Sequence, residues 1–240
     1  MLSPTGNLIP ASETTVASAP KKISQHLYPR LRWLALAWLV IYIPSYGMAY
    51  GAMNFLFLCN LGVIITAYAL LNNHQLLISS QAIASPVIGL VWGLDAGARL
   101  LTGSFLFGGT EYMWDPQYPL WTRVLSLYHL VWPVLVVWCV KKNGYDRRGW
   151  PLQVGITGIT MLLSRLLTEP QLNVNFSYTD PFFGLQLGPA PLHLAIITAA
   201  MGVFAYGLTH LLLTRALKCP PTSLSSSPKT SPIDEPPTAS

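Results

Sequence analysis

The stretch WLALAWLVIYIPSYGMAYGAMNFLFLCNLGVIITAYALL, residues 33–71, contains no Asp, Glu, Lys or Arg. A membrane-spanning helix needs about 20 mostly apolar residues, because the hydrocarbon core is about 30 Å thick and a helix rises about 1.5 Å per residue. The stretch is long enough for two such helices joined by a short turn. It therefore predicts two antiparallel transmembrane helices, at about residues 33–50 and 52–71.

The rest of the chain is also rich in hydrophobic residues and poor in charged ones. Of its 240 residues, 52% are hydrophobic and only 10% are charged, whereas soluble domains carry about 25% charged residues. Four further apolar stretches are long enough to span a bilayer, at about residues 76–102, 120–140, 152–168 and 191–214. We therefore expect an all-α membrane protein with six transmembrane helices.

The charges in the loops give the orientation. Basic residues gather in three segments: Lys21, Lys22, Arg30 and Arg32; Lys141, Lys142, Arg147 and Arg148; Arg215 and Lys218. Six spans place all three segments on one side, and the loops of the other side carry Glu111, Asp115, Glu169 and Asp180 but no Lys or Arg. By the positive-inside rule both termini are cytoplasmic. We expect a polar N-terminal tail (1–30), a transmembrane domain (31–218) and a disordered Pro/Ser-rich tail (219–240).

Composition and motifs exclude several classes of function. The net charge of +5 comes from bases beside the apolar spans, so we expect no nucleic-acid partner. Cys59, Cys139 and Cys219 match neither a disulfide framework nor a metal motif. The spacing of His129 and His193 does not favour haem ligation. We therefore expect no cofactor and no metal, and known nucleotide-binding and hydrolase motifs are missing from the sequence.

Strongly polar side chains are costly within a span, and here they cluster at similar depth in the outer half of the bilayer. They include Cys59 and Asn60 in the second span, Asp95 and Arg99 in the third, and Arg123, Ser126 and His129 in the fourth. Asp95 and Arg99 are four residues apart on one helix face, which predicts a structural ion pair. Pro133 cannot donate a hydrogen bond to the His129 carbonyl, which predicts a kink and a free carbonyl. The pattern indicates a buried polar chamber that opens outward.

Two interpretations of Cys59 and His129 remain open at the level of sequence. The imidazole could withdraw the thiol proton, and the thiolate could then attack an acyl carbonyl. Alternatively, Cys59 is a packing residue, as most buried cysteines are, and His129 makes an interhelical hydrogen bond. Asn60, Arg123, Asn173 and Asn175 are candidate oxyanion donors or, alternatively, ordinary interhelical and loop hydrogen-bond donors.

Several short motifs carry a resemblance to a known family. FLCN (57–60), TRVLSLYHLVWP (122–133), NVNFSY (173–178) and LGPAP (187–191) stand on or beside the second, fourth, fifth and sixth spans. Residues 33–215 resemble the bacterial six-helix integral membrane family related to eukaryotic transmembrane protein 164, which is distantly similar to the androgen-induced membrane lipid hydrolases. The resemblance implies lipid acyl transfer or acyl hydrolysis within the membrane. By motif, Cys59 and His129 correspond to the Cys and His of that chemistry.

Three functions remain as hypotheses. The first is an intramembrane lipid acyltransferase or hydrolase with Cys59 and His129 as catalytic pair. The second is a small-solute carrier or permease whose polar chamber holds its substrate, with Asp95 and Arg99 in it. The third is a non-catalytic membrane assembly protein. Membrane lipids are the expected partners, a homo-oligomer is left open, and the expected location is a bacterial inner membrane.

Overall fold

The computed structural model describes residues 26–217, and this part of the chain contains helices but no strands. The longer helices are α1 (Leu31–Tyr50), α2 (Leu58–Leu71), α3 (Gln75–Thr102), α5 (Tyr128–Asn143) and α6 (Gly149–Leu167). Shorter segments are η1 (Ala52–Leu56), η2 (Glu111–Met113), α4 (Leu120–Leu125), η3 (Pro170–Leu172) and η4 (Val174–Phe176). The last apolar stretch forms α7 (Ala190–Ala200), the π-helical η5 (Met201–Tyr206) and α8 (Gly207–Ala216).

The all-helical fold class is confirmed for these residues. The C-terminal tail predicted at residues 219–240, with Cys219, and most of the N-terminal tail predicted at residues 1–30 lie outside the described residues.

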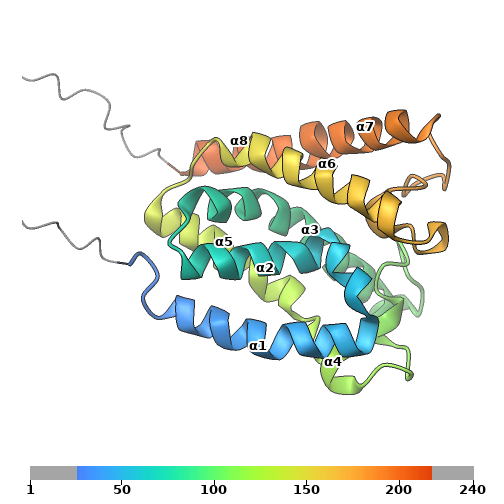
Figure 1. Cartoon of the computed structure of the whole chain (residues 1–240), viewed down its shortest axis with the longest axis horizontal. Helices are drawn as coiled ribbons and strands as arrows, with labels where there is room; N and C mark the ends of the chain where they lie inside the picture. The colour runs from blue at the N-terminus through green and yellow to red at the C-terminus, as the bar shows by residue number, and fades with distance from the viewer. Residues whose placement is uncertain (1–25, 218–240) are drawn as a thin grey trace, which may run out of the picture.

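The helices run side by side along one axis of the molecule (Figure 1). Helices α6, α7 and α8 form one edge and α1 the opposite edge. Helix α3 is central, because it packs against α2, α5, α6 and α8. The described chain begins and ends at one end of the bundle, where the turns 72–74 and 144–148 also lie. Loops 103–119 and 168–189 lie at the other end, which we call the loop end.

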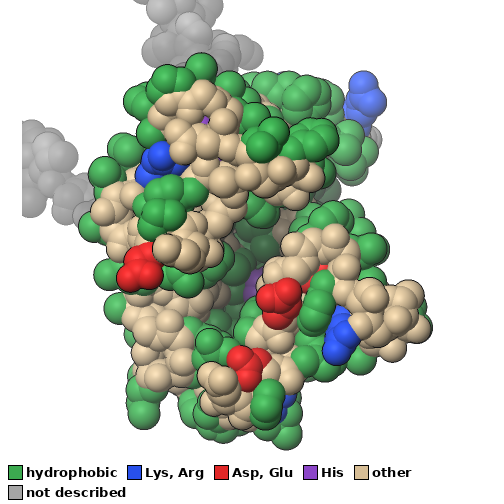
Figure 2. Space-filling view, turned by 90° about the vertical axis from the view of Figure 1, so that its right-hand side faces the viewer, with side chains coloured by type: hydrophobic (Ala, Val, Ile, Leu, Met, Phe, Trp, Pro, Cys, Tyr) green, Lys and Arg blue, Asp and Glu red, His purple; other side chains and the backbone are tan. Residues whose placement is uncertain are grey.

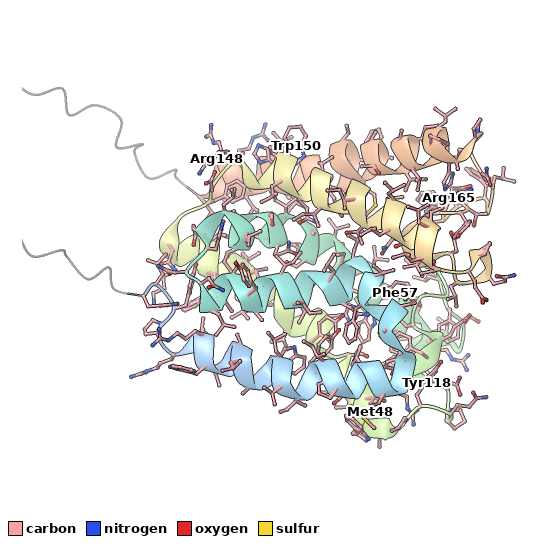
Figure 3. The ribbon with its side chains drawn as sticks, in the orientation of Figure 1. Met48, Phe57, Tyr118, Arg148, Trp150 and Arg165 are labelled. Carbon is pink, nitrogen blue, oxygen red and sulfur yellow. The ribbon has the colours of Figure 1, made fainter. Side chains whose placement is uncertain are left out.

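Labelled side chains mark the two ends in Figure 3. Arg148 and Trp150 lie at the end where the described chain starts and stops, and Arg165 lies toward the loop end. Arg148 forms an ion pair with Asp146 at 2.7 Å, the one ion pair within residues 26–217. The hydrogen bonds from Arg148 hold the pKa of the Asp146 carboxyl below its ordinary value.

Four helical segments among the described residues are long and apolar enough to cross a membrane. They are Leu31–Tyr50, Gln75–Thr102, Leu120–Asn143 and Ala190–Ala216. Helix α2 is apolar but has only 14 residues, because η1 and a break at Phe57 occupy the start of its predicted span. Helix α6 has 19 residues, but Gln153 and Arg165 lower its apolar character.

Many large hydrophobic side chains lie exposed on the outside of the bundle. Val40, Leu100 and Phe204 expose 66%, 75% and 76% of their surface. Inside, Gln81 and Gln153 are buried, and the Gln81 amide donates to Gln153 Oε1 at 3.1 Å. An apolar exterior around neutral polar contacts reverses the pattern of a soluble protein and is typical of helices packed within a bilayer.

Candidate functional site

Two adjoining cavities lie toward the loop end. The apolar cavity, of about 720 Å³, lies between α3 and the stretch formed by α7 and η5. The tyrosine cavity, of about 300 Å³, takes its hydroxyl-bearing walls from Tyr46, Tyr50, Tyr112 and Tyr118. The residues that line both cavities are Cys59, Trp92, Gly109 and His129. Figure 2 looks onto the loop end and shows a hollow between two lobes, with hydrophobic side chains on its walls.

His129 is fixed on three sides near the start of α5. Its ring stacks between the rings of Trp92, at 4.9 Å between centroids, and Tyr128, at 4.1 Å. Its Nδ1–H donates at 2.8 Å to the Ser126 carbonyl, which also accepts the His129 backbone N–H at 3.1 Å where the helix is interrupted between α4 and α5. Its Nε2 has no hydrogen-bond partner among residues 26–217. The neutral ring therefore carries its lone pair on Nε2, as a general base requires.

Cys59 lies in the first turn of α2 and is partly buried. The backbone N–H groups of Cys59 and Asn60 bind no carbonyl in the described part of the chain, as is usual for the first turn of a helix. The Cys59 thiol donates to Asn60 Oδ1, with 3.7 Å between the sulfur and the oxygen. Unpaired N–H groups at a helix N-terminus stabilise negative charge that develops beside them.

Asn60 organises a cluster of tyrosines beside Cys59. Its Oδ1 accepts hydrogen bonds from Tyr42 at 2.6 Å and Tyr128 at 2.7 Å, and its Nδ2 donates to the Asn54 carbonyl at 2.7 Å. The amide is buried with both ends occupied. Asn60 therefore positions its neighbours, and its amide is not free to serve as the predicted oxyanion donor.

Asn175 ties the loop after α6 to the start of α2. Its Oδ1 accepts from the Leu58 N–H at 2.9 Å, and its Nδ2 donates to the Leu56 carbonyl at 2.7 Å. Asn175 adopts a positive φ of 56°. The residue lines the apolar cavity, but its amide fixes the backbone next to Cys59 instead of facing a substrate. Asn173 likewise folds its own loop by bonding Tyr178 and Thr179.

The predicted ion pair between Asp95 and Arg99 does not form. The Asp95 carboxylate accepts N–H donors from the loop that follows α3, with Phe107 N at 2.6 Å and Thr110 N at 2.9 Å. Arg99 instead binds the Gly103 carbonyl and lies over the Phe105 ring at 5.0 Å. The loop N–H groups lack other partners, so they compete with the guanidinium for the same carboxylate.

Two further residues from the sequence analysis lie outside the junction of the cavities. Arg123 donates from Nη1 to the Met113 carbonyl at 3.0 Å and lines neither cavity. His193 is fully buried, accepts from Leu187 N at Nδ1 and donates from Nε2 to the Phe176 carbonyl. Both of its ring nitrogens therefore hold loops together.

The His129 carbonyl, which the sequence analysis expected to lack its helical donor, lies against a neighbouring helix. It faces Gly89 of α3, where a Cβ would lie 2.5 Å from this oxygen and 2.6 Å from Pro133 Cγ. Pro133 removes the helical donor, and Gly89 supplies the space into which the carbonyl fits. This contact sets the distance between α3 and the helix that carries His129.

The tyrosine cluster is the part of the site that the sequence analysis missed. Tyr42, Tyr46 and Tyr50 are spaced by four on α1, which places them on one helix face. The Tyr42 ring lies 4.3 Å from Tyr46 and 5.6 Å from Tyr128. Burial raises the pKa of Tyr112 well above its ordinary value, so this hydroxyl stays protonated at neutral pH. The spacing of the three tyrosines on α1 was the sequence signal from which this cluster could have been predicted.

Comparisons of the chain with protein-family models, with curated proteins and with solved structures find no match. The functional argument therefore depends on the cavities and on the residues that line them.

Proposed function

We propose that this chain is an intramembrane enzyme that hydrolyses or transfers the acyl group of a membrane lipid, with Cys59 as nucleophile and His129 as general base. The observation that carries the proposal is that both side chains line the junction of an apolar and a hydroxyl-lined cavity. An acyl ester has the same division, with an apolar chain on one side of the carbonyl and an alcohol on the other. Its carbonyl would lie at Cys59.

The reaction proceeds through a thioester. His129 Nε2 takes the thiol proton of Cys59, and Sγ forms a bond to the ester carbonyl carbon. When the tetrahedral intermediate collapses, the ester C–O bond breaks and His129 returns the proton to the departing alcohol. Water or a second alcohol then attacks the thioester, His129 takes its proton, and Cys59 leaves with that proton as a thiol. Water gives hydrolysis, and an alcohol gives acyl transfer.

The oxyanion donors are backbone groups in this proposal. The N–H groups of Cys59 and Asn60 lie in the first turn of α2 and lack carbonyl partners among the described residues. They replace the side chains of Asn60 and Asn175, whose amides are engaged elsewhere, and of Arg123, which lines neither cavity. Removing one donor from an oxyanion hole typically lowers kcat by about 10²–10³-fold.

We also propose that the chain crosses the membrane six times, with both termini in the cytoplasm. The two ends of the described chain lie together with the turns that hold the basic residues 141–148. The loop end then faces outward, and the reacting pair lies in the outer half of the bilayer. The location we propose is a bacterial inner membrane.

An activity-based probe tests the catalytic proposal. Native membranes with wild type, Cys59→Ala or His129→Ala are treated with a lipid-tailed acyl-thioester or fluorophosphonate probe, and labelling is read after gel separation. We expect labelling of wild type and its loss in both variants. Cys139→Ala is the matched control, because Cys139 is fully buried and lines neither cavity.

Two results oppose the proposal. If well-folded wild type is not labelled, the thiol is not activated. If labelling persists in His129→Ala, the base is another group. The carrier alternative predicts flux of a small solute in proteoliposomes that survives Cys59→Ala, but the Asp95–Arg99 pair on which it relied is absent among the described residues.

A further inference from the structure

The apolar cavity has one side that faces the lipid. Its two long walls are Val87–Asp95 of α3 and Ile196–Ala205 of α7 and η5. Val91 exposes 43% of its surface, Ile196 40% and Phe204 76%, so the rims of both walls lie on the outside of the bundle. Helix α3 packs against η5 and α8, whereas α7 packs against α6. The cavity is therefore accessible laterally, from within the bilayer.

The far end of the cavity is closed. Ile88, Met201 and Ala205 line it and pack against the buried hydrophobic core. The wall from Ile196 to Ala205 extends over roughly 13 Å, at a rise of about 1.5 Å per residue. A slot of this length, apolar and open along its side, suits one hydrocarbon chain.

The tyrosine cavity offers hydroxyl groups but no cation. Lys and Arg are missing from the described linings of both cavities. Asp95 and Asp180, which line the apolar cavity, have carboxylates occupied by backbone N–H groups. Arg123 is close enough to Tyr50 to interact with it electrostatically, but its guanidinium donates to the Met113 carbonyl and the residue does not line the tyrosine cavity. A phosphate in this cavity would be a buried charge without a partner, which is strongly unfavourable.

We infer that the substrate is a neutral acyl ester with one long chain. The chain enters laterally between α3 and α7 and fills the apolar cavity, and a small uncharged alcohol part such as glycerol lies among the tyrosine hydroxyls. This inference rests on the proposed function, since it places the ester carbonyl at Cys59. Its binding part can be tested with catalysis removed.

Photo-crosslinking of Cys59→Ala tests where the chain lies. The probe is a monoacylglycerol with a diazirine at the end of its chain, and the labelled peptides are mapped by mass spectrometry. We expect labelling within Met201–Ala205. Ala205→Phe fills the closed end and should shift labelling toward Ile196–Ala200, while Val203→Phe, on the exposed face of the same segment, should leave it unchanged.

Competition for the same probe tests the head group. Unlabelled monoacylglycerol should displace the probe at about tenfold lower concentration than lysophosphatidylcholine of equal chain length, because the phosphate lacks a partner. Equal competition by the two lipids would contradict the preference for a neutral head group. An unchanged labelling pattern in Ala205→Phe would contradict the assignment of the apolar cavity to the acyl chain. If Cys59→Ala binds as expected but wild type shows no acyl chemistry, the inference stands as a binding site and the proposed enzyme fails.

Discussion

At the scale of single residues, Gly89 shows most directly how sequence controls the site. A methyl group at this position would meet the His129 carbonyl and the Pro133 ring. We expect Gly89→Ala to lower the free energy of unfolding by about 1–3 kcal/mol, as overpacking does, and to displace His129 so that labelling of Cys59 falls. Denaturant unfolding in detergent micelles measures the first effect.

Gly97→Ala is the matched control for this change. Gly97 lies on the same helix, and a Cβ there would meet nothing within 4 Å. We expect it to be neutral or to stabilise the protein by about 0.5–1 kcal/mol through helix propensity. Equal stabilities of the two variants would contradict the contact that we assign to Gly89.

Residue spacing predicted the site only in part. The depth of Cys59 and His129 along their helices indicated a shared chamber, and both line the same two cavities. Spacing failed for Asp95 and Arg99, because a loop of unpartnered N–H groups folds back onto the carboxylate. A periodic pattern describes one helix and contains no information about which loop returns to it.

At the scale of elements, one carboxylate organises the last part of the loop after α6. Asp180 accepts N–H donors from Phe182, Phe183 and Leu185 at 2.8–2.9 Å, and these bonds hold its pKa below the ordinary value. A depressed pKa means that the stabilisation is present above the unfolded value of about 3.9 and is lost as pH falls through the folded value. We expect the loop to open in that acidic range.

Hydrogen exchange measured by mass spectrometry, corrected for the intrinsic exchange rate at each pH, tests whether the loop held by Asp180 opens in acid. The amides of residues 182–185 should gain exchange in acid, and Asp180→Asn should raise their exchange already at neutral pH. Asp115→Asn is the control, since the carboxylate of half-buried Asp115 accepts only the Gln117 N–H among the described contacts. Unchanged exchange in Asp180→Asn would show that the loop is held by other contacts.

Most helix boundaries lie close to the predicted ones, but the start of α2 and the internal breaks were not predicted. The apolar stretches gave the six helical regions, but not the interruption between α4 and α5 or the π-helical turn of η5. At the interruption, the Ser126 carbonyl accepts both the backbone N–H and the ring Nδ1–H of His129. In η5, the Gly202 carbonyl accepts from Trp150 Nε1 at 3.0 Å. Such breaks depend on partners from other helices, which hydropathy cannot show.

At the scale of the whole molecule, the number of crossings decides on which side of the membrane each turn lies. Only four helical segments among residues 26–217 are long and apolar enough by themselves. The proposed six spans add α2 and α6, which pack beside α3 within the bundle. A short or partly polar helix can cross a bilayer when its neighbours shield it from lipid. The two counts place the same turns on opposite sides of the membrane.

Cysteine accessibility separates the two counts. In a Cys59→Ala, Cys139→Ala, Cys219→Ala background, single cysteines replace four exposed residues: His74→Cys, Gln117→Cys, Arg147→Cys and Gln186→Cys. With six spans and a cytoplasmic N-terminus, a membrane-impermeant maleimide should label positions 117 and 186 in intact spheroplasts, and positions 74 and 147 only after permeabilisation. With four spans, positions 74 and 147 would be labelled from outside and position 117 would be protected. That result would place Cys59 and His129 outside the proposed outer-leaflet site, because α2 and α6 would no longer cross the bilayer beside them.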